Sequence, residues 1–218
     1  MNRQKQFVLF VRNAIHAIAP NLADGIESAR AAEEYRRAIA KTGFQVPLPQ
    51  FIKRSIIKKI LVEHGCRILV ETGTFLGDTP WTLRKDLDEI YTIELSPELV
   101  ALARNRFRNY PGINIVEGDS GERLREIVPR LKSKTLFWLD GHYSAGITAK
   151  GNVNCPILAE LETILTGCLV PWVILIDDAR CFGGDDRDYP SILELNAYIG
   201  KYCPTASITV ENDIIRVV

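Results

Sequence analysis

The stretch that decides the fold is Glu71-Thr-Gly-Thr-Phe-Leu-Gly77, which follows the apolar run Ile68-Leu-Val70. A β-branched run, two glycines and a helical pattern from about residue 79 predict a strand, a tight turn and a helix. Gly73 would let a ligand approach the backbone, and the first turn of the helix would offer unpaired N–H groups. Taken alone, the stretch fits a nucleotide-binding loop, and it also fits a plain tight turn.

The same alternation continues to the end of the chain. Strands are predicted at residues 67–71, 89–94, 113–117, 135–140 and 172–177, and helices near residues 79–87, 97–107, 121–131, 156–165 and 191–202. Such alternation is typical of a parallel sheet wrapped by helices. Two last strands, 206–210 and 214–218, are joined by a connection too short for a crossover, so they run antiparallel. The pattern predicts an α/β fold with a doubly wound, mostly parallel sheet of seven strands and a terminal antiparallel hairpin.

The first part of the chain differs in pattern and charge. Apolar residues recur at helical spacing from residue 7 to about 40, and a short helix over residues 51–64 should close at Gly65 with a left-handed cap. Residues 1–60 hold eleven Lys and Arg against four Asp and Glu, whereas the rest of the chain is acidic. We therefore expect an N-terminal helical extension, residues 1–65, before a catalytic domain, residues 66–218.

Composition excludes several classes of protein. The chain has 218 residues, and its 27 Lys and Arg balance 27 Asp and Glu, which removes the basic field that drives nucleic-acid binding. Its five cysteines include no C-x-x-C pair, so neither a disulfide framework nor a zinc knuckle is predicted. No apolar run approaches the roughly 20 residues of a membrane span, and charged residues interrupt any signal peptide. We expect a cytoplasmic protein.

Acidic residues end four of the predicted parallel strands, namely Glu71, Glu94, Asp140 and Asp177. Ligands of open α/β sheets bind beyond the carboxyl ends of the strands, so these acids should converge on one edge. Glu94 follows the glycine loop at the distance suited to a carboxylate that binds ribose hydroxyls, or else it caps the next helix. Asp119 and Ser120 would face an adenine or, equally compatibly, cap the helix that they begin.

The ordered motifs Glu71-Thr-Gly-Thr-Phe-Leu-Gly77, Ile93-Glu-Leu-Ser96, Glu117-Gly-Asp-Ser120 and Leu139-Asp-Gly-His142 resemble those of class I S-adenosylmethionine-dependent methyltransferases. The resemblance covers about residues 67–218 and departs at Phe75, where many members have glycine. It implies a Rossmann-like fold and S-adenosylmethionine as cofactor. The implied cofactor-binding residues are Glu71, Thr72, Gly73, Thr74, Gly77, Glu94, Leu95, Asp119, Ser120 and Asp140, with Glu94 on the ribose, Asp119 and Ser120 at the adenine, and Asp140 beside the sulfonium.

Later motifs are similar to those of the metal-dependent sugar O-methyltransferases of the macrocin type. Asp140-Gly-His-Tyr143 and Ile176-Asp-Asp178 carry this resemblance, which implies that Asp140, Asp177 and Asp178 hold Mg²⁺ or Mn²⁺. Three carboxylates gathered at neighbouring strand ends would also repel one another unless a cation lay among them. Where the family has an aromatic residue after the paired aspartates, this chain has Ala179-Arg180.

The expected activity is methyl transfer from S-adenosylmethionine to a hydroxyl oxygen, most simply of a sugar or glycan acceptor. His142 or Asp140 would take the proton, although a lone histidine is as often a structural neighbour of a carboxylate. Glu160, on the predicted helix after Pro156, is a further candidate, although an exposed helical Glu usually has no catalytic role. The competing hypotheses are a nucleotide-dependent oxidoreductase and a cofactor-binding protein without catalysis.

The basic residues Lys53, Arg54, Lys58 and Lys59 suggest a role for the N-terminal extension. They would attract a phosphate-bearing sugar if the extension covers the acceptor site. They could equally form a solvated helix face or pack a homodimer.

Overall fold

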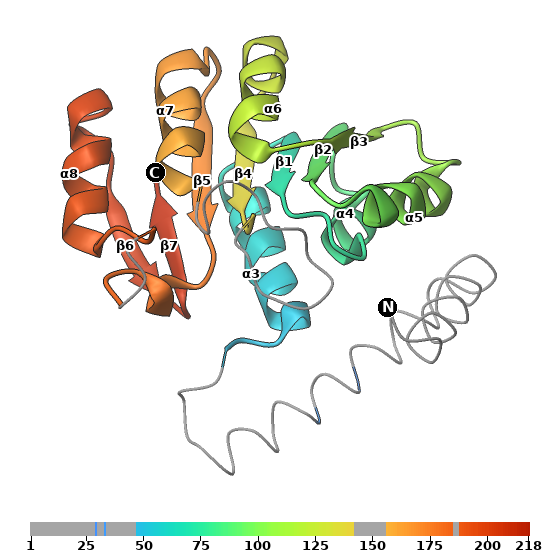
Figure 1. Ribbon diagram of the computed structural model, residues 1–218, viewed down its shortest axis with the longest axis horizontal. Coiled ribbons are helices and arrows are strands. Elements are labelled where there is room, and N and C mark those ends of the chain that lie inside the picture. The colour runs from blue at the N-terminus through green and yellow to red at the C-terminus, as the bar shows by residue number, and fades with distance from the viewer. Residues whose placement is uncertain (1–28, 30–32, 34–46, 142–155, 185–187) are drawn as a thin grey trace. The chain divides into compact units, whose positions relative to one another are not determined.

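The computed structural model describes residues 29, 33, 47–141, 156–184 and 188–218 (Figure 1). The chain divides into two compact units, Met1–Ile56 and Ile57–Val218. Helix α3 (Gln50–Glu63) runs from the first unit into the second, which holds the whole sheet. The helices predicted before residue 43, His142 and Cys155 lie outside the described residues.

The sheet has seven strands in the order β3-β2-β1-β4-β5-β7-β6. The strands are β1 (Ile68–Thr72), β2 (Glu89–Glu94), β3 (Ile113–Glu117), β4 (Thr135–Leu139), β5 (Trp172–Ile176), β6 (Ile208–Glu211) and β7 (Ile214–Val217). The first five run parallel, and β7 pairs antiparallel with both β5 and β6. The predicted seven-stranded, mostly parallel fold with a terminal antiparallel hairpin is confirmed.

Helices follow the strands in the predicted alternation. They are α4 (Asp78–Leu83), α5 (Pro97–Phe107), α6 (Ser120–Ile127), α7 (Ile157–Gly167) and α8 (Ile192–Tyr202), with short 3₁₀ turns at Val128–Arg130 and Ala179–Cys181. Figure 1 shows α6, α7 and α8 in a row beside the sheet. Among the described residues, no helix has the length and apolar character needed to cross a membrane.

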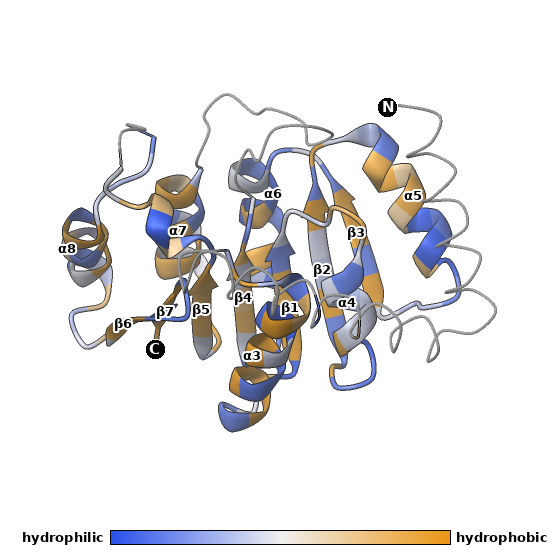
Figure 2. Ribbon diagram, turned by 90° about the horizontal axis from the view of Figure 1, so that it is seen from below, coloured by the Kyte–Doolittle hydropathy of each residue, from blue (hydrophilic) through white to orange (hydrophobic). Residues whose placement is uncertain are grey.

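The core explains why the central strands read as continuous apolar runs. Both β1 and β4 are buried at every position, and Figure 2 shows the apolar colouring of β4 and β5. Strands buried on both faces have no need for alternation. On one face Leu124, Leu161 and Leu195 bring α6, α7 and α8 into a single cluster with the sheet. On the other face, Trp81 of α4 and Phe107 of α5 pack with residues of β3.

The differences from prediction lie at element ends and have local causes. Helix α6 stops at Ile127, and the 3₁₀ turn that follows contains Pro129, which has no N–H to donate. Helix α4 stops at Leu83, where Asp86 N donates to Leu83 O in a turn. The predicted left-handed cap at Gly65 is confirmed, with φ 63°. The terminal hairpin turns through Asn212 and Asp213, both at positive φ, as a two-residue type I′ turn requires.

Candidate functional site

The loop after β1 passes against the end of β4 with no room to spare. Gly73 has φ 87°, and its N–H and that of Thr74 donate to Ile93 O at 2.9 and 3.1 Å. A Cβ on Gly73 would lie 2.6 Å from Asp140 O. Only glycine fits this backbone conformation and this approach. The loop therefore brings the ends of β1, β2 and β4 together.

Phe75 occupies the position where the resembled family commonly has glycine, and the backbone explains why. Its φ is 48°, in the left-handed region that glycine adopts without strain. An L-residue there costs about 1–2 kcal/mol. Its N–H donates to Glu94 Oε2 at 2.8 Å, which offsets part of that cost. The loop thus keeps the conformation of a glycine loop, with an aromatic side chain exposed on it.

Glu94 is held in place at the carboxyl end of β2. Besides the bond from Phe75, its Oε1 accepts from Ser96 N at 2.9 Å, and the side chain is only 6% exposed. The Ser96 hydroxyl caps the following helix α5, because it accepts a hydrogen bond from Leu99 N. Capping α5 is therefore not the task of Glu94. Each carboxylate oxygen can accept more than one hydrogen bond, so Glu94 can bind a ligand hydroxyl as well.

Glu71 lies beneath the glycine loop. Its side chain is buried, and Thr92 Oγ1 donates to its Oε2 at 2.6 Å. Burial raises the pKa of Glu71 to about 8, although the hydroxyls of Thr92 and Thr79 oppose the shift. Thr74 Oγ1 lies 2.6 Å from Thr92 Oγ1 and continues this buried polar chain. Glu71 and Thr74 are therefore linked through Thr92 at the glycine loop, and their contact with the cofactor stays a prediction.

Asp119 and Ser120 begin helix α6 next to the end of β3. Asp119 is the N-cap residue by its backbone, but its side chain makes no capping hydrogen bond. The alternative that this carboxylate serves as a side-chain cap is thus not the observed geometry. Ser120 and Leu95, at the ends of neighbouring elements, are both partly accessible. The helix N-terminus beside them favours hydrogen-bond acceptors.

The end of β4 is joined to β1 through one hydroxyl. Asp140 N and Gly141 N donate to Thr72 Oγ1 at 3.2 and 3.1 Å. On the other side, Asp177 N donates to Leu139 O at 3.0 Å, so Asp140 and Asp177 follow paired residues of neighbouring strands. Asp140 is partly accessible and Asp177 is buried. The sequence prediction that acids meet at the carboxyl edge is consistent with this placement.

Asp178 faces a different partner. Its φ of 56° is left-handed, and its Oδ1 accepts from Arg180 Nη1 at 2.8 Å. Arg180 also pairs with Asp213 in the β6–β7 turn, and its N–H donates to Asp213 Oδ1. Within the described part of the chain, no three His, Cys, Asp or Glu side chains gather closely enough to hold a metal ion. As placed, Asp140, Asp177 and Asp178 do not form a ready three-ligand site, so their metal role stays a prediction.

Sequence reasoning named Glu160 as a candidate but set it aside as an exposed residue. The expectation of an exposed helical residue is wrong, because Glu160 is fully buried in α7. Burial raises the pKa of Glu160 to about 7. A signal was present in the sequence, since Ile157, Leu161 and Ile164 place Glu160 within the apolar stripe of the helix.

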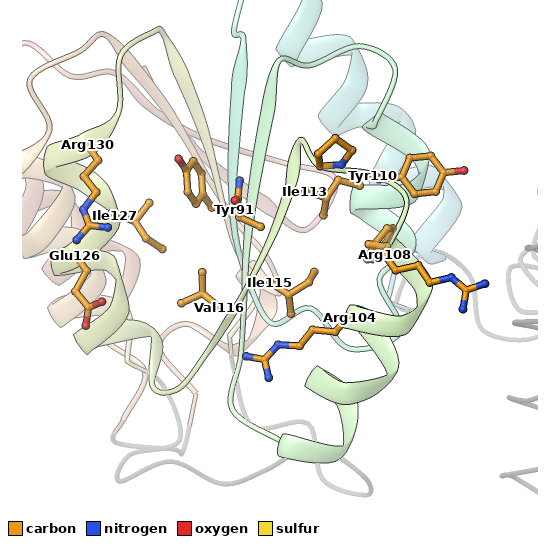
Figure 3. A pocket seen from close by; sticks show the side chains of 13 residues that line it. Tyr91, Arg104, Arg108, Tyr110, Ile113, Ile115, Val116, Glu126, Ile127 and Arg130 are labelled. Carbon is orange, nitrogen blue, oxygen red and sulfur yellow. The ribbon is translucent and has the colours of Figure 1, made fainter.

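A cavity of about 630 Å³ lies elsewhere, along the edge strand β3 (Figure 3). Arginines at the end of α5 and after α6 border it, and Tyr91, Ile115 and Val116 are among its lining residues. None of the predicted site residues lines it. Arg104 at its border pairs with Glu117 at 3.2 Å. Charged residues beside an open edge also prevent pairing with other strands.

Comparison with known proteins supports the fold. No protein-family model and no curated protein matches the sequence. A Staphylococcus aureus protein provisionally assigned as a caffeoyl-CoA O-methyltransferase aligns with TM-score 0.53 and 14% identity over 91% of this chain and 97% of its own. Podospora anserina methyltransferase PaMTH1, bound to S-adenosylhomocysteine (SAH), aligns with TM-score 0.52 and 18% identity over 88% and 86%. A Bacillus cereus O-methyltransferase in complex with SAH aligns with TM-score 0.51 and 17% identity over 87% and 90%. The chain therefore has the Rossmann-like fold of the S-adenosylmethionine-dependent methyltransferases.

Proposed function

We propose that this protein is an S-adenosylmethionine-dependent methyltransferase that acts on a hydroxyl oxygen of a sugar or another small acceptor. The observation that carries the proposal is the carboxyl edge of the sheet. There the glycine loop, Glu94, Asp119 and Asp140 stand at the ends of β1, β2, β3 and β4 in the order expected for this cofactor. The fold that the chain shares with methyltransferases supports the same conclusion.

The residues at this edge suit the parts of the cofactor. Gly73 lets the loop pass against the end of β4, at a place where any side chain would meet Asp140 O. Glu94, oriented by two backbone N–H groups, would accept hydrogen bonds from the ribose hydroxyls. Asp119, whose carboxylate makes no capping bond, would accept from the adenine amine. The residues present therefore fit S-adenosylmethionine.

When bound, S-adenosylmethionine supplies a methyl group that is already activated by its sulfonium. The protein has two remaining tasks, which are to align the acceptor oxygen with that carbon and to remove one proton. Asp140, held at the end of β4 through Thr72, would take the proton at its carboxylate. His142, the other predicted base, lies outside the described residues and stays a prediction.

No step of this mechanism is assigned to a metal ion. The reason is that one of the three predicted metal ligands, the Asp178 carboxylate, already pairs with the Arg180 guanidinium. The metal-assisted form predicted from the sequence makes a distinct experimental claim, namely that a chelator abolishes activity and Mg²⁺ restores it.

The rival oxidoreductase hypothesis has less support. The short-chain dehydrogenases need a Tyr-x-x-x-Lys pair, and none of the seven tyrosines has a lysine four residues later. The antiparallel hairpin β6–β7 also departs from the all-parallel order of dinucleotide-binding sheets.

Calorimetry with SAH and, separately, with NADH tests the proposal. We expect SAH to bind and NADH not to bind. Glu94→Ala should weaken SAH binding by about 1.5 to 3 kcal/mol, because a charge-assisted contact is lost. Glu89→Ala, at the exposed far end of the same strand, is the matched control and should leave the affinity unchanged. Binding of NADH without binding of SAH would refute the proposal.

The acceptor is found by incubating the protein with S-adenosylmethionine carrying a labelled methyl group and a panel of nucleotide sugars and glycans. Label transferred to a sugar hydroxyl would support the proposed acceptor class. Label transferred to nitrogen, or to none of these acceptors, would contradict the proposed acceptor class. The cofactor assignment would not be affected, because calorimetry tests it separately.

A further inference from the structure

Glu160 is a buried carboxylate that the proposed mechanism does not use. It is 0% exposed, and neither Oε1 nor Oε2 has a hydrogen-bond partner of standard geometry among the described residues. Burying an unsatisfied carboxyl group lowers stability. A chain under selection for stability alone would carry an apolar residue at this position of α7, so the carboxyl calls for a functional explanation.

The surroundings of Glu160 belong to the carboxyl edge of the sheet. A Cβ built on Gly141 would lie 3.3 Å from Glu160 Oε1 and 3.0 Å from Thr72 Oγ1. Both oxygens therefore lie next to the Gly141 backbone. The hydroxyls of Ser120 and Thr72 are near enough to stabilise the ionised form of Glu160. Neither reaches good hydrogen-bond geometry with its oxygens.

Thr72 connects Glu160 to the end of β4. Its Oγ1 accepts from both Asp140 N and Gly141 N, which leaves its own proton to be donated to another acceptor. Ser120 is the first residue of α6, next to Asp119. Glu160 thus adjoins the hydroxyls of two elements on which, under the proposed function, the adenosine part of the cofactor would rest.

We propose that Glu160 is a positioning residue of the cofactor site, which orients the Thr72 and Ser120 hydroxyls and through them the end of β4 and the start of α6. This inference rests on the proposed function. Glu160 itself does not touch the reacting atoms. Its carboxyl accepts one hydrogen bond from each hydroxyl once the cofactor draws the two elements into their final positions.

The experiment compares stability with cofactor affinity in four single variants, in the double variant Thr72→Val/Glu160→Leu, and in Glu160→Met as a folding control. Glu160→Leu removes the acceptor at similar volume, and Glu160→Gln keeps one acceptor oxygen. Thr72→Val removes the connecting hydroxyl, and Glu162→Gln, on the exposed side of the same helix, is the matched control. Thermal melting and calorimetry with SAH are measured on the full chain of each variant.

The expected result separates function from folding. Glu160→Leu should melt no lower than the wild type, because it removes an unsatisfied buried carboxyl, but should bind SAH about fivefold or more weakly. Glu160→Gln should retain most of the affinity, and Glu162→Gln should change neither measurement. In the Thr72→Val background, Glu160→Leu should cause no further loss, since both changes break one connection.

Three results would overturn the inference. The first is unchanged SAH affinity in Glu160→Leu, and the second is losses that add in the double variant. The third is failure of both Glu160→Leu and Glu160→Met to fold, which would show a structural role, because flexible methionine fills the same space. Failure of the wild type to bind SAH would instead refute the proposed function.

Discussion

Replacing Gly73 by alanine tests the arrangement on which the site depends. The new Cβ would lie 2.6 Å from Asp140 O and 3.2 Å from Asp140 C, both of them backbone atoms. Real Cβ atoms do not approach so closely, so the loop after β1 or the end of β4 must shift. The position also has φ 87°, which an L-residue tolerates poorly.

The two costs can be separated with a second glycine. At Gly65, φ is 63° and an added Cβ would meet nothing within 4 Å, so Gly65→Ala carries backbone strain alone, about 1–2 kcal/mol. Gly73→Ala carries comparable strain plus forced displacement of packed backbone, which typically adds about 1–3 kcal/mol. The expected loss in free energy of unfolding is therefore about 2–5 kcal/mol for Gly73→Ala.

Urea denaturation of both variants, followed by calorimetry with SAH on the folded proteins, measures these effects. Gly65 lies before β1, away from the carboxyl edge, so Gly65→Ala should leave SAH affinity unchanged. Gly73→Ala should weaken SAH binding, because it displaces Asp140 from the loop. Equal destabilisation by the two variants, or normal SAH affinity in Gly73→Ala, would refute the reasoning.

Three further predictions address charge, metal and the N-terminal extension. The pKa of Glu71 is raised to about 8 from 4.5, so the folded state holds a proton that the unfolded state loses, and wild-type stability falls as pH rises between these values. In urea denaturation Glu71→Gln should therefore gain stability over the wild type at pH 8 and not at pH 4; an equal difference at both values would contradict the raised pKa. If the metal site predicted from the sequence operates, a chelator should abolish methyl transfer and Mg²⁺ should restore it; full activity in chelator would mean that Asp178 serves only its pair with Arg180. Deleting residues 1–45 should raise the Michaelis constant for the acceptor without changing SAH affinity if the extension covers the acceptor site, whereas an unchanged constant at low and high salt would exclude that role.

Ion pairs of two lysines in α3 are relevant to the prediction that the N-terminal extension covers the acceptor site. Lys58 pairs with Asp86 at 2.8 Å and Lys59 with Glu63 at 3.6 Å, both at exposed positions. These two cations therefore have carboxylate partners within the second compact unit, as the alternative of a solvated helix face expects. The truncation experiment is thus a test of residues 1–45 rather than of these lysines.

Much of the fold could be predicted because short-range patterns decide it. The bounds of β2, β3 and α5 agree with the sequence prediction, since each is a clear periodic segment between strong turn residues. The antiparallel direction of β7 followed from the length of its connection alone. Element ends were less predictable, because a proline in the turn after α6 or a backbone hydrogen bond in the turn after α4 decides where a helix stops.

The site was predicted in part. The sequence order of the motifs indicated which strand ends carry Glu94, Asp119 and Asp140. It could not indicate that the Glu94 carboxylate is held by Phe75 N, or that the Phe75 backbone adopts the conformation of a glycine. Both facts depend on contacts between residues far apart in the chain.

The sequence by itself determined the alternation of strands and helices, the final hairpin and the presence of acids at strand ends, because periodicity, connection length and residue type are local properties. Only the tertiary structure decided which acids are buried, paired or accessible. Glu71 and Glu160 become desolvated because other elements cover them, and Asp178, at a left-handed backbone position, pairs with Arg180. The charge and hydrogen bonding of a carboxylate depend on what surrounds it, and folding brings those neighbours from distant parts of the chain.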